Sequence, residues 1–317
     1  MKIVYFGTPE FAVPSLTRLI DSPHHVVAVV SQPDRPRGRG HRTQVTPTKA
    51  VAQARGIPVL QPERVKDPQF LAQLSSYEPD LGVVAAYGRI LPDALLAVPR
   101  LGMINVHGSI LPAYRGAAPV HRAVIAGDSE TGVTIMRVIS ELDAGPTFAT
   151  RRRAIGPDET SADVERALAD LGADVLVEVV DSIAAGRAEE TPQDDSRATF
   201  APKLAKTEGR IDWSQPASVI HNLVRGLHPW PLASARLGAS RLVVRKTDLK
   251  KVAGSVSLGA AAPGTIVSAT PDGLDILCGD GNLIRITEIQ PEGKRAMPVR
   301  DFLAGHTIPP GARLEVP

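Results

Sequence analysis

The sequence contains a single cysteine, no long apolar run and no dinucleotide-binding glycine pattern at its first turn. Cys278 is the one cysteine among 317 residues, which excludes a disulfide framework and a cysteine-rich zinc site and fits a reducing compartment. No stretch approaches the ~20 apolar residues that a membrane-spanning helix requires. The apolar run at the N-terminus is too short for a signal peptide. We therefore expect a cytoplasmic protein without membrane contact.

The first strand-to-helix turn lacks the glycine pattern of dinucleotide-binding proteins. The apolar run 2–7 predicts a strand, and the turn Gly7-Thr8-Pro9-Glu10-Phe11 does not follow G-x-G-x-x-G. Neither a nicotinamide nor a flavin cofactor is therefore predicted. The motifs H-E-x-x-H and C-x-x-C are also absent, so we expect no metal site.

The length of the chain exceeds what one hydrophobic core usually holds, which predicts two domains. Residues 1–187 alternate short apolar runs with helical patterns, as is typical of an α/β domain with a doubly wound, Rossmann-like sheet. Residues 188–210 are polar and are interpreted as a linker. Residues 211–317 carry short β-rich pieces separated by glycine turns, which favours a smaller, OB-like β-barrel.

Basic charge is unevenly distributed although the net charge is only +2. Residues 209–317 contain 13 Lys/Arg against 9 Asp/Glu, a net charge of +4. The long segment 32–48 is also basic, and Gly38 and Gly40 flank one of its arginines. Arginine pairs well with phosphate and with guanine edges, so both regions could meet an anionic partner. Ordinary solvated charge and a flexible surface insertion are the alternatives.

Two polar residues lie within or directly after the buried strand predicted at 103–106. Asn105 and His107 alternate with apolar residues and should project from the same face of the strand. An amide and an imidazole at the carboxyl end of a strand can bind a developing oxyanion. A hydrogen-bonded core pair is the alternative. The glycine after the histidine, the Ser-Ile-Leu-Pro turn and the run Arg115–Pro119 favour the functional interpretation.

Two loops could complete such a site. Asp143 precedes Gly145-Pro146, and a carboxylate there could orient a histidine, hold its charge or move protons. A turn-forming aspartate is the alternative. Tyr87–Pro92 follows the buried strand predicted at 81–86, and its glycine would let a ligand approach the backbone. A plain turn explains that fragment equally well.

Together these motifs resemble the folate-dependent formyltransferases, a family that includes glycinamide ribonucleotide transformylase, formyltetrahydrofolate hydrolase and sugar formyltransferases. The resemblance to the members that formylate methionyl-tRNA covers almost the whole chain. It rests on GTPEFA at 7–12, DRPRGRG at 34–40, AYGRILP at 86–92, NVHGSILP at 105–112, RGAAP at 115–119, IDW at 211–213, HPWP at 228–231 and GKRAM at 293–297. The departures are small: Ile110 replaces the more usual leucine, and His228 replaces asparagine.

The resemblance implies that the formyl group of 10-formyltetrahydrofolate moves to the α-amino group of initiator methionyl-tRNA, for translation initiation. It implies that Asn105 and protonated His107 donate to the tetrahedral oxyanion, and that Asp143 holds the histidine charge and relays the proton of the amine. It places the tetrahydrofolate derivative against Tyr87, Gly88, Ile90, Leu91, Ser109, Ile110, Leu111 and Pro112. It places the tRNA against Arg35, Arg37, Arg39, Arg42, Lys294 and Arg295. We expect a monomer that needs no metal.

Two other functions stay open at this point. A formyltransferase for an amino sugar nucleotide could keep the same three polar residues but would have no use for the long Arg-Gly loop. A non-catalytic RNA-binding protein on the same scaffold is the second alternative. The intact set of Asn105, His107 and Asp143 argues against it.

Overall fold

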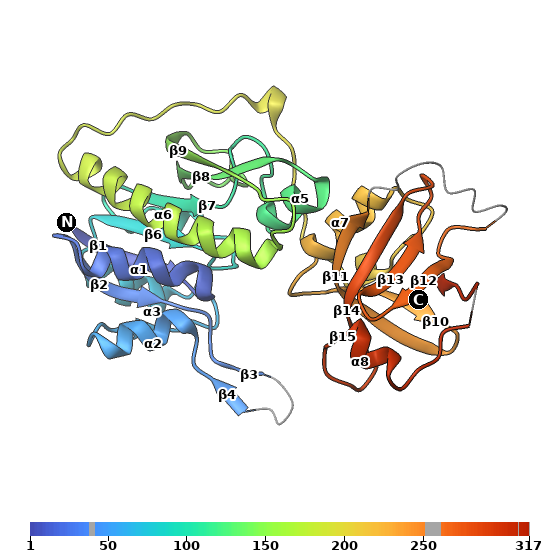
Figure 1. Cartoon of the computed structure of the whole chain (residues 1–317). Helices are drawn as coiled ribbons and strands as arrows, with labels where there is room; N and C mark the ends of the chain where they lie inside the picture. Colours follow the sequence, from blue (N-terminus) through green and yellow to red (C-terminus); the bar gives the residue numbers. More distant parts are fainter. Residues whose placement is uncertain (38–41, 251–260, 310, 317) are drawn as a thin grey trace. The chain divides into compact units, whose positions relative to one another are not determined.

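The computed structural model describes residues 1–37, 42–250, 261–309 and 311–316 (Figure 1). The chain forms two compact units, and each is assembled from three separate stretches. The first contains residues 1–119, 130–153 and 165–202, and the second contains residues 120–129, 154–164 and 203–317. The sequence-based boundaries at 1–187, 188–210 and 211–317 stay a prediction.

A mostly parallel sheet forms the centre of the first unit. Its strand order is β5-β2-β1-β6-β7-β8-β9, with β1, β2, β5, β6 and β7 paired in parallel and β8 antiparallel to β7. All residues of β6 are buried, because helices cover both faces of a parallel sheet. The bounds are β1 (Lys2–Gly7), β2 (His25–Val30), β5 (Val59–Leu60), β6 (Leu81–Ala85), β7 (Met103–His107), β8 (Glu130–Arg137) and β9 (Thr147–Ala154).

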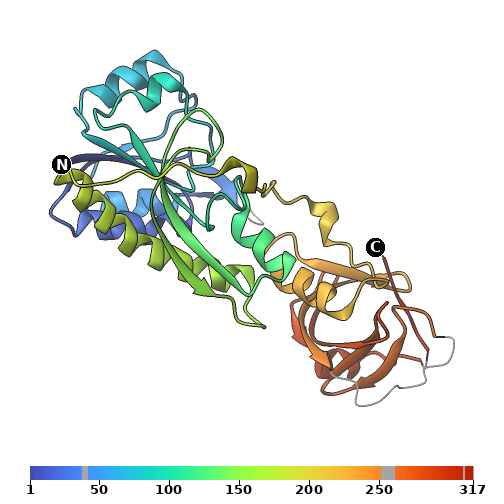
Figure 2. The same cartoon turned by 90° about the horizontal axis from the view of Figure 1, so that it is seen from above.

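Helices lie on both sides of this sheet (Figure 2). In that view the light-blue and teal helices α3 and α4 lie on one side, and α1 and α6 lie on the other. Phe70 of α3 and Leu95 of α4 share a buried cluster with Phe6 of β1. On the opposite face, a Cβ added to Gly172 of α6 would lie 2.8 Å from Val106 of β7. The helices of this unit are α1 (Val13–Ile20), α2 (Pro47–Ala54), α3 (Pro68–Ser75), α4 (Asp93–Leu96) and α6 (Ser161–Ala184), whose first residues belong to the second unit. Apart from Pro119, α5 (Pro119–Ala126) belongs to the second unit.

An antiparallel sheet forms the core of the second unit. Its order is β12-β13-β14-β11-β10-β16, and β15 pairs with β14. Trp213, in the turn before α7, and Ile220 of α7 pack with Ile276 and Ile284 of the strands in one buried cluster. Cys278 belongs to this cluster, and burial raises the pKa of its thiol to about 12. The bounds are α7 (Ala217–Gly226), β10 (Ala233–Leu237), β11 (Ser240–Lys250), β12 (Ile266–Thr270), β13 (Gly273–Leu277), β14 (Leu283–Pro291), β15 (Met297–Pro298), α8 (Val299–Leu303) and β16 (Leu314–Glu315).

The structure also contains elements that the sequence patterns did not predict. Strand β9 includes three consecutive arginines and is largely exposed, so it lacks the alternation that marks a half-buried strand. A 3₁₀ turn occupies Glu10–Ala12 directly before α1, which begins at Val13. None of the helices in the described residues has the length and hydropathy needed to cross a membrane.

Candidate active site

Two of the three predicted catalytic residues lie close together at the end of β7. His107 is the last residue of this strand and is 5% exposed. Its Nδ1 atom lies 3.7 Å from Oδ2 of Asp143, whose side chain is 18% exposed. Asn105 lies two residues earlier on the same strand and is half-buried. Since residues two apart on a strand share a face, the amide and the imidazole lie on the same side of β7.

The hydrogen bonds of these side chains leave polar atoms free for a third group. Nε2 of His107 lies 3.0 Å from the carbonyl oxygen of Tyr114, which can only accept, so Nε2 carries the proton of this hydrogen bond. The 3.7 Å separation from Asp143 is longer than a hydrogen bond. The amide of Asn105 makes no side-chain hydrogen bond within the described part of the chain. The Asn105 amide and Nδ1 of His107 can therefore serve a bound molecule.

Asp143 is held in an unusual backbone conformation. Its φ angle is 48°, in the left-handed region that aspartate tolerates better than most residues. The backbone N–H of Gly116 donates to its Oδ2 atom over 2.8 Å. The loop also lies tight against β8, because a Cβ on Gly145 would be 2.0 Å from the carbonyl oxygen of Arg137. The carboxylate is thus fixed by the RGAAP run, which the sequence placed near the site without assigning it this contact.

A glutamine that the sequence interpretation missed supports the Asp143 loop. Gln193 donates from Nε2 to the carbonyl oxygens of Asp143 and Gly145, over 2.8 and 2.7 Å. Its Oε1 atom accepts from Nε and Nη2 of Arg115. Residue 193 lies in the polar stretch interpreted as a linker, and no spacing or hydrophobic pattern distinguishes it from its neighbours.

The predicted folate segment Ser109–Pro112 is a turn closed by internal hydrogen bonds. The hydroxyl of Ser109 donates to the carbonyl oxygen of Ala113 over 2.6 Å. Thr134 of β8 locks the turn, because its hydroxyl donates to the carbonyl oxygen of Ser109 and accepts from the N–H of Leu111. The Ser109 hydroxyl is thereby already used within the protein. Binding of folate along this turn stays a prediction that depends on its backbone.

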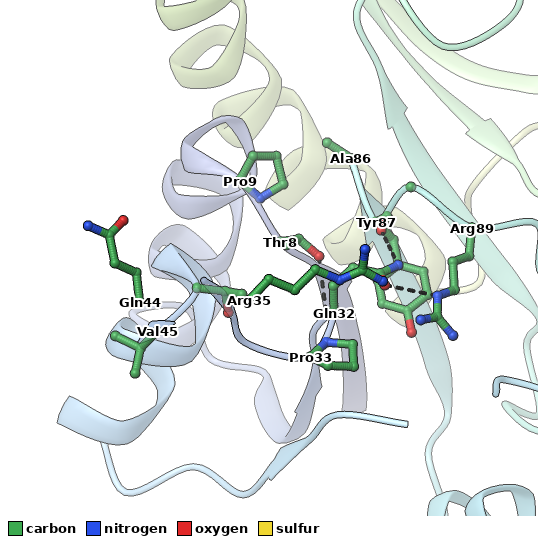
Figure 3. Close-up of a pocket in the computed structure, with 12 residues that line it drawn as sticks. Thr8, Pro9, Gln32, Pro33, Arg35, Gln44, Val45, Ala86, Tyr87 and Arg89 are labelled. Carbon is green, nitrogen blue, oxygen red and sulfur yellow. Dashed lines mark hydrogen bonds between the residues drawn. The ribbon is translucent and has the colours of Figure 1, made fainter. Parts of the chain in front are cut away.

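A pocket of about 470 Å³ adjoins the other predicted folate segment, residues 87–91 (Figure 3). Gln32 is hydrogen-bonded to two other residues that line the pocket: its Nε2 atom donates to the carbonyl oxygen of Tyr87, and its Oε1 atom accepts from Nε of Arg89. The hydroxyl of Tyr87 is buried without a partner in the described residues, and burial raises its pKa to about 12, so it stays neutral. Ile90 is 85% exposed, whereas Leu91 is buried. An exposed isoleucine beside a pocket is a surface that a ligand could cover.

The predicted tRNA-binding loop is partly a hairpin. Strands β3 (Arg35–Arg37) and β4 (Arg42–Gln44) pair antiparallel, with Arg37 opposite Arg42 in register. Arg35 is exposed and its side chain lies across the pocket of Figure 3. Arg39 and its two flanking glycines lie outside the described residues.

One cation of this region is already paired. Nζ of Lys49 lies 2.5 Å from Oδ2 of Asp34, and the hydrogen bond from Lys49 lowers the pKa of that carboxyl. Gln61 donates to the same carboxylate. The ion pair anchors the start of the hairpin and removes Lys49 from the charges that could meet an anion.

The other predicted tRNA contacts belong to the second unit. Lys294 and Arg295 are exposed in the turn between β14 and β15. The N–H of Lys294 donates to the carbonyl oxygen of Pro291, and Gln290 donates to the carbonyl oxygen of Lys294. The turn is therefore held by its backbone, and its two cationic side chains point to solvent.

Comparison with known proteins identifies the family. Residues 1–180 match the family described as formyl transferase, and residues 203–307 match the one described as formyl transferase, C-terminal domain. The chain belongs to the formyltransferase family. It is 45% identical over 312 residues to a methionyl-tRNA formyltransferase of Myxococcus xanthus, covering 98% of this chain and 97% of the relative. It is 46% identical over 308 residues to one of Methylococcus capsulatus, covering 97% and 98%.

Solved structures confirm the fold class predicted for this formyltransferase. A sugar 3N-formyl transferase, solved in the presence of dTDP and 5-N-formyl-THF, superposes with a TM-score of 0.68. The match covers 93% of this chain and 99% of that chain at 16% identity. At this identity the likeness shows the fold alone. It matches both the Rossmann-like unit and the antiparallel unit.

Metal ligands are not grouped in the part of this formyltransferase that the structure describes. No cluster of three or more His, Cys, Asp or Glu side chains suited to a metal ion occurs there.

Proposed function

We propose that this chain transfers the formyl group of 10-formyltetrahydrofolate to the α-amino group of initiator methionyl-tRNA. The observation that carries the proposal is the convergence of Asn105, His107 and Asp143 at the end of β7, with His107 and Asp143 3.7 Å apart. Identities of about 45% to curated methionyl-tRNA formyltransferases over almost the full chain support the choice of acceptor.

The three side chains can carry each step of the transfer. The amine attacks the formyl carbon, and the formyl oxygen becomes an oxyanion. The Asn105 amide and a protonated His107 donate hydrogen bonds to it through the atoms that the protein leaves unbonded. The intermediate collapses as the bond between the carbon and N10 of the folate breaks. Asp143 removes the proton that the amine nitrogen loses, and N10 takes one up.

The two substrates would meet at residues 87–89, which belong to the predicted folate segment and also line the pocket of Figure 3. The folate would lie along residues 87–91 and 109–112, where it could contact backbone groups and the exposed side chain of Ile90. The pocket of Figure 3 suits the 3′-terminal nucleoside of the tRNA, because Pro9 and Pro33 offer apolar walls beside the Arg35 guanidinium. The pocket follows the ends of β1, β2 and β6. The strand order switches there, because β2 is added on one side of β1 and β6 on the other. Ligands of open α/β sheets bind at such a point.

A radiolabel assay tests the proposal. Purified protein is incubated with 10-formyltetrahydrofolate that carries label in the formyl group, and with either initiator methionyl-tRNA or a dTDP-linked amino sugar. Label should move to the tRNA and not to the sugar. Transfer to the sugar alone would restore the amino sugar alternative, and transfer to neither would contradict the proposed reaction.

The proposal also includes a cytoplasmic monomer that works without a metal. These properties follow from the sequence expectations above. Treatment with a chelator should leave the rate of transfer unchanged, and sedimentation at micromolar concentration should give the mass of one chain. A chelator-sensitive rate would contradict the metal-free chemistry.

A further inference from the structure

The segment 191–201 contains a 3₁₀ turn at Asp195–Arg197 and is hydrogen-bonded to the strand that follows the Asp143 loop and to the turn at Tyr114 and Arg115. The N–H and carbonyl groups of Thr191 pair with those of Thr147, directly after the Asp143 loop. Further along, Thr199 accepts from the backbone N–H groups of Tyr114 and Arg115. Residues 191–201 thus run from the loop that carries the carboxylate to the turn that faces His107.

Gln193 is the side chain of this segment that reaches the Asp143 loop. Its amide nitrogen donates to two carbonyl oxygens, those of Asp143 and Gly145, and its amide oxygen accepts from the Arg115 guanidinium. Two carbonyls require a donor and a guanidinium requires an acceptor, so the orientation of the amide is dictated by its partners. A carboxylate of the same length could satisfy Arg115 but not the two carbonyls.

Arg115 holds the amide oxygen of Gln193. Arg115 is 6% exposed, and its Nη2 atom also donates to Oδ1 of Asp195 over 2.6 Å. The buried guanidinium is therefore both hydrogen-bonded and charge-compensated. Because its planar fork has little freedom to turn, it confines the Gln193 amide to the present geometry.

Both the backbone carbonyl and the carboxylate of Asp143 are consequently held by hydrogen bonds. Gln193 holds its backbone carbonyl, and the N–H of Gly116 holds its Oδ2 atom. The residue has a φ of 48°, a conformation that persists only where the surroundings impose it. Releasing the carbonyl would let the loop relax and move the carboxylate away from Nδ1 of His107.

We propose that Gln193, backed by Arg115, is a positioning residue that holds the Asp143 carboxylate opposite His107 for the transfer step. The inference rests on the proposed function, in which Asp143 takes the proton of the amine. Displacing a reacting group by about 1 Å can cost up to ~100-fold in rate. Loss of the Gln193 donors should therefore lower kcat and leave the substrate-binding surfaces unchanged.

The test compares Gln193→Glu with Gln193→Met and with a neighbouring control. Both variants keep the length of the side chain and remove the two donors, and only the first keeps an acceptor for Arg115. Each should lower kcat roughly tenfold to 100-fold, while KM for methionyl-tRNA and for the folate changes less than about threefold. Asp194→Ala should keep the wild-type kcat, because among the described residues the Asp194 carboxylate accepts hydrogen bonds from Ser196 of its own turn and from no residue of the Asp143 loop.

A second measurement separates positioning from general support of the fold. Gln193→Glu is combined with Asp143→Asn, and single-turnover transfer of label is followed with enzyme in excess. If Gln193 acts through Asp143, the double variant should be less than about twofold slower than Asp143→Asn alone. Losses that multiply in full, or a wild-type kcat in a folded Gln193→Met, would overturn the inference. An inactive wild type would instead contradict the proposed function.

Discussion

Replacing Asn105 by alanine should abolish most of the activity and cost the fold almost nothing. The amide is half-buried on β7 and makes no hydrogen bond to a described residue. It is not among the polar side chains that are buried without a partner in the described residues, so its amide stays accessible from outside the protein. Such an arrangement is expected of a group that meets its partner only when substrate is bound.

The two effects differ in size and can be separated. Removing one oxyanion donor typically lowers kcat by ~10²–10³, or roughly 2.7–4 kcal/mol of the barrier. Removing a hydrogen-bonded buried group typically costs about 1–3 kcal/mol of stability. Since Asn105 has no such bond to lose, the free energy of unfolding should stay within about 1 kcal/mol of the wild type. For a chain of this size that corresponds to roughly 3 °C in Tm at most.

The assay measures kcat with both substrates saturating, and Tm on the same preparations. Asn105→Asp serves as a second variant, because it removes the same donors and adds a negative charge beside the oxyanion. It should be slower still than the alanine variant. A near-normal kcat together with a loss of more than about 2 kcal/mol in stability would refute the reasoning. That result would restore the alternative of a hydrogen-bonded core residue.

Three further changes have expected outcomes of their own. Asp34→Asn should lose stability near neutral pH and match the wild type at low pH, as unfolding at several pH values would show. The hydrogen bond from Lys49 lowers the pKa of Asp34 in the folded state, so the ionised carboxylate stabilises the fold above its ordinary pKa and loses this effect as pH falls through the folded-state pKa. A difference in unfolding free energy between variant and wild type that is the same at every pH would contradict this. Gly172→Ala should destabilise by about 1–2 kcal/mol in urea unfolding, because overpacking against Val106 exceeds the gain in helix propensity; a more stable variant would mean that α6 shifts freely. Lys294→Ala should weaken the binding of all tRNAs about equally. In filter-binding assays it should also reduce the slope of log K against log salt concentration by about 1, and an unchanged slope would show that this residue does not contact the tRNA.

The parallel strands and the pair on β7 could be predicted because their signals are local. Buried parallel strands produce continuous apolar runs, and Asn105 and His107 stand out because they interrupt one. The position of Asp143 beside His107 could not be derived in this way. The two residues are 36 positions apart in the sequence. Strand β8 runs antiparallel to β7 with Arg137 opposite Ile104, and the loop that follows it places the carboxylate beside His107. The resemblance to the formyltransferases, rather than spacing, indicated that contact.

Gln193 shows where interpretation of the sequence had to fail. The stretch 188–210 has the polar composition of a linker, and a glutamine that clamps a loop looks the same in it as one that faces solvent. The role of Gln193 depends on hydrogen bonds to two carbonyl oxygens and a guanidinium, which belong to residues 48 to 78 positions away in the sequence. With Gln193 as a positioning residue, Asn105, His107 and Asp143 are not sufficient for fast transfer. A chain that keeps all three and replaces the Gln193 amide by a carboxylate should bind both substrates and turn over slowly.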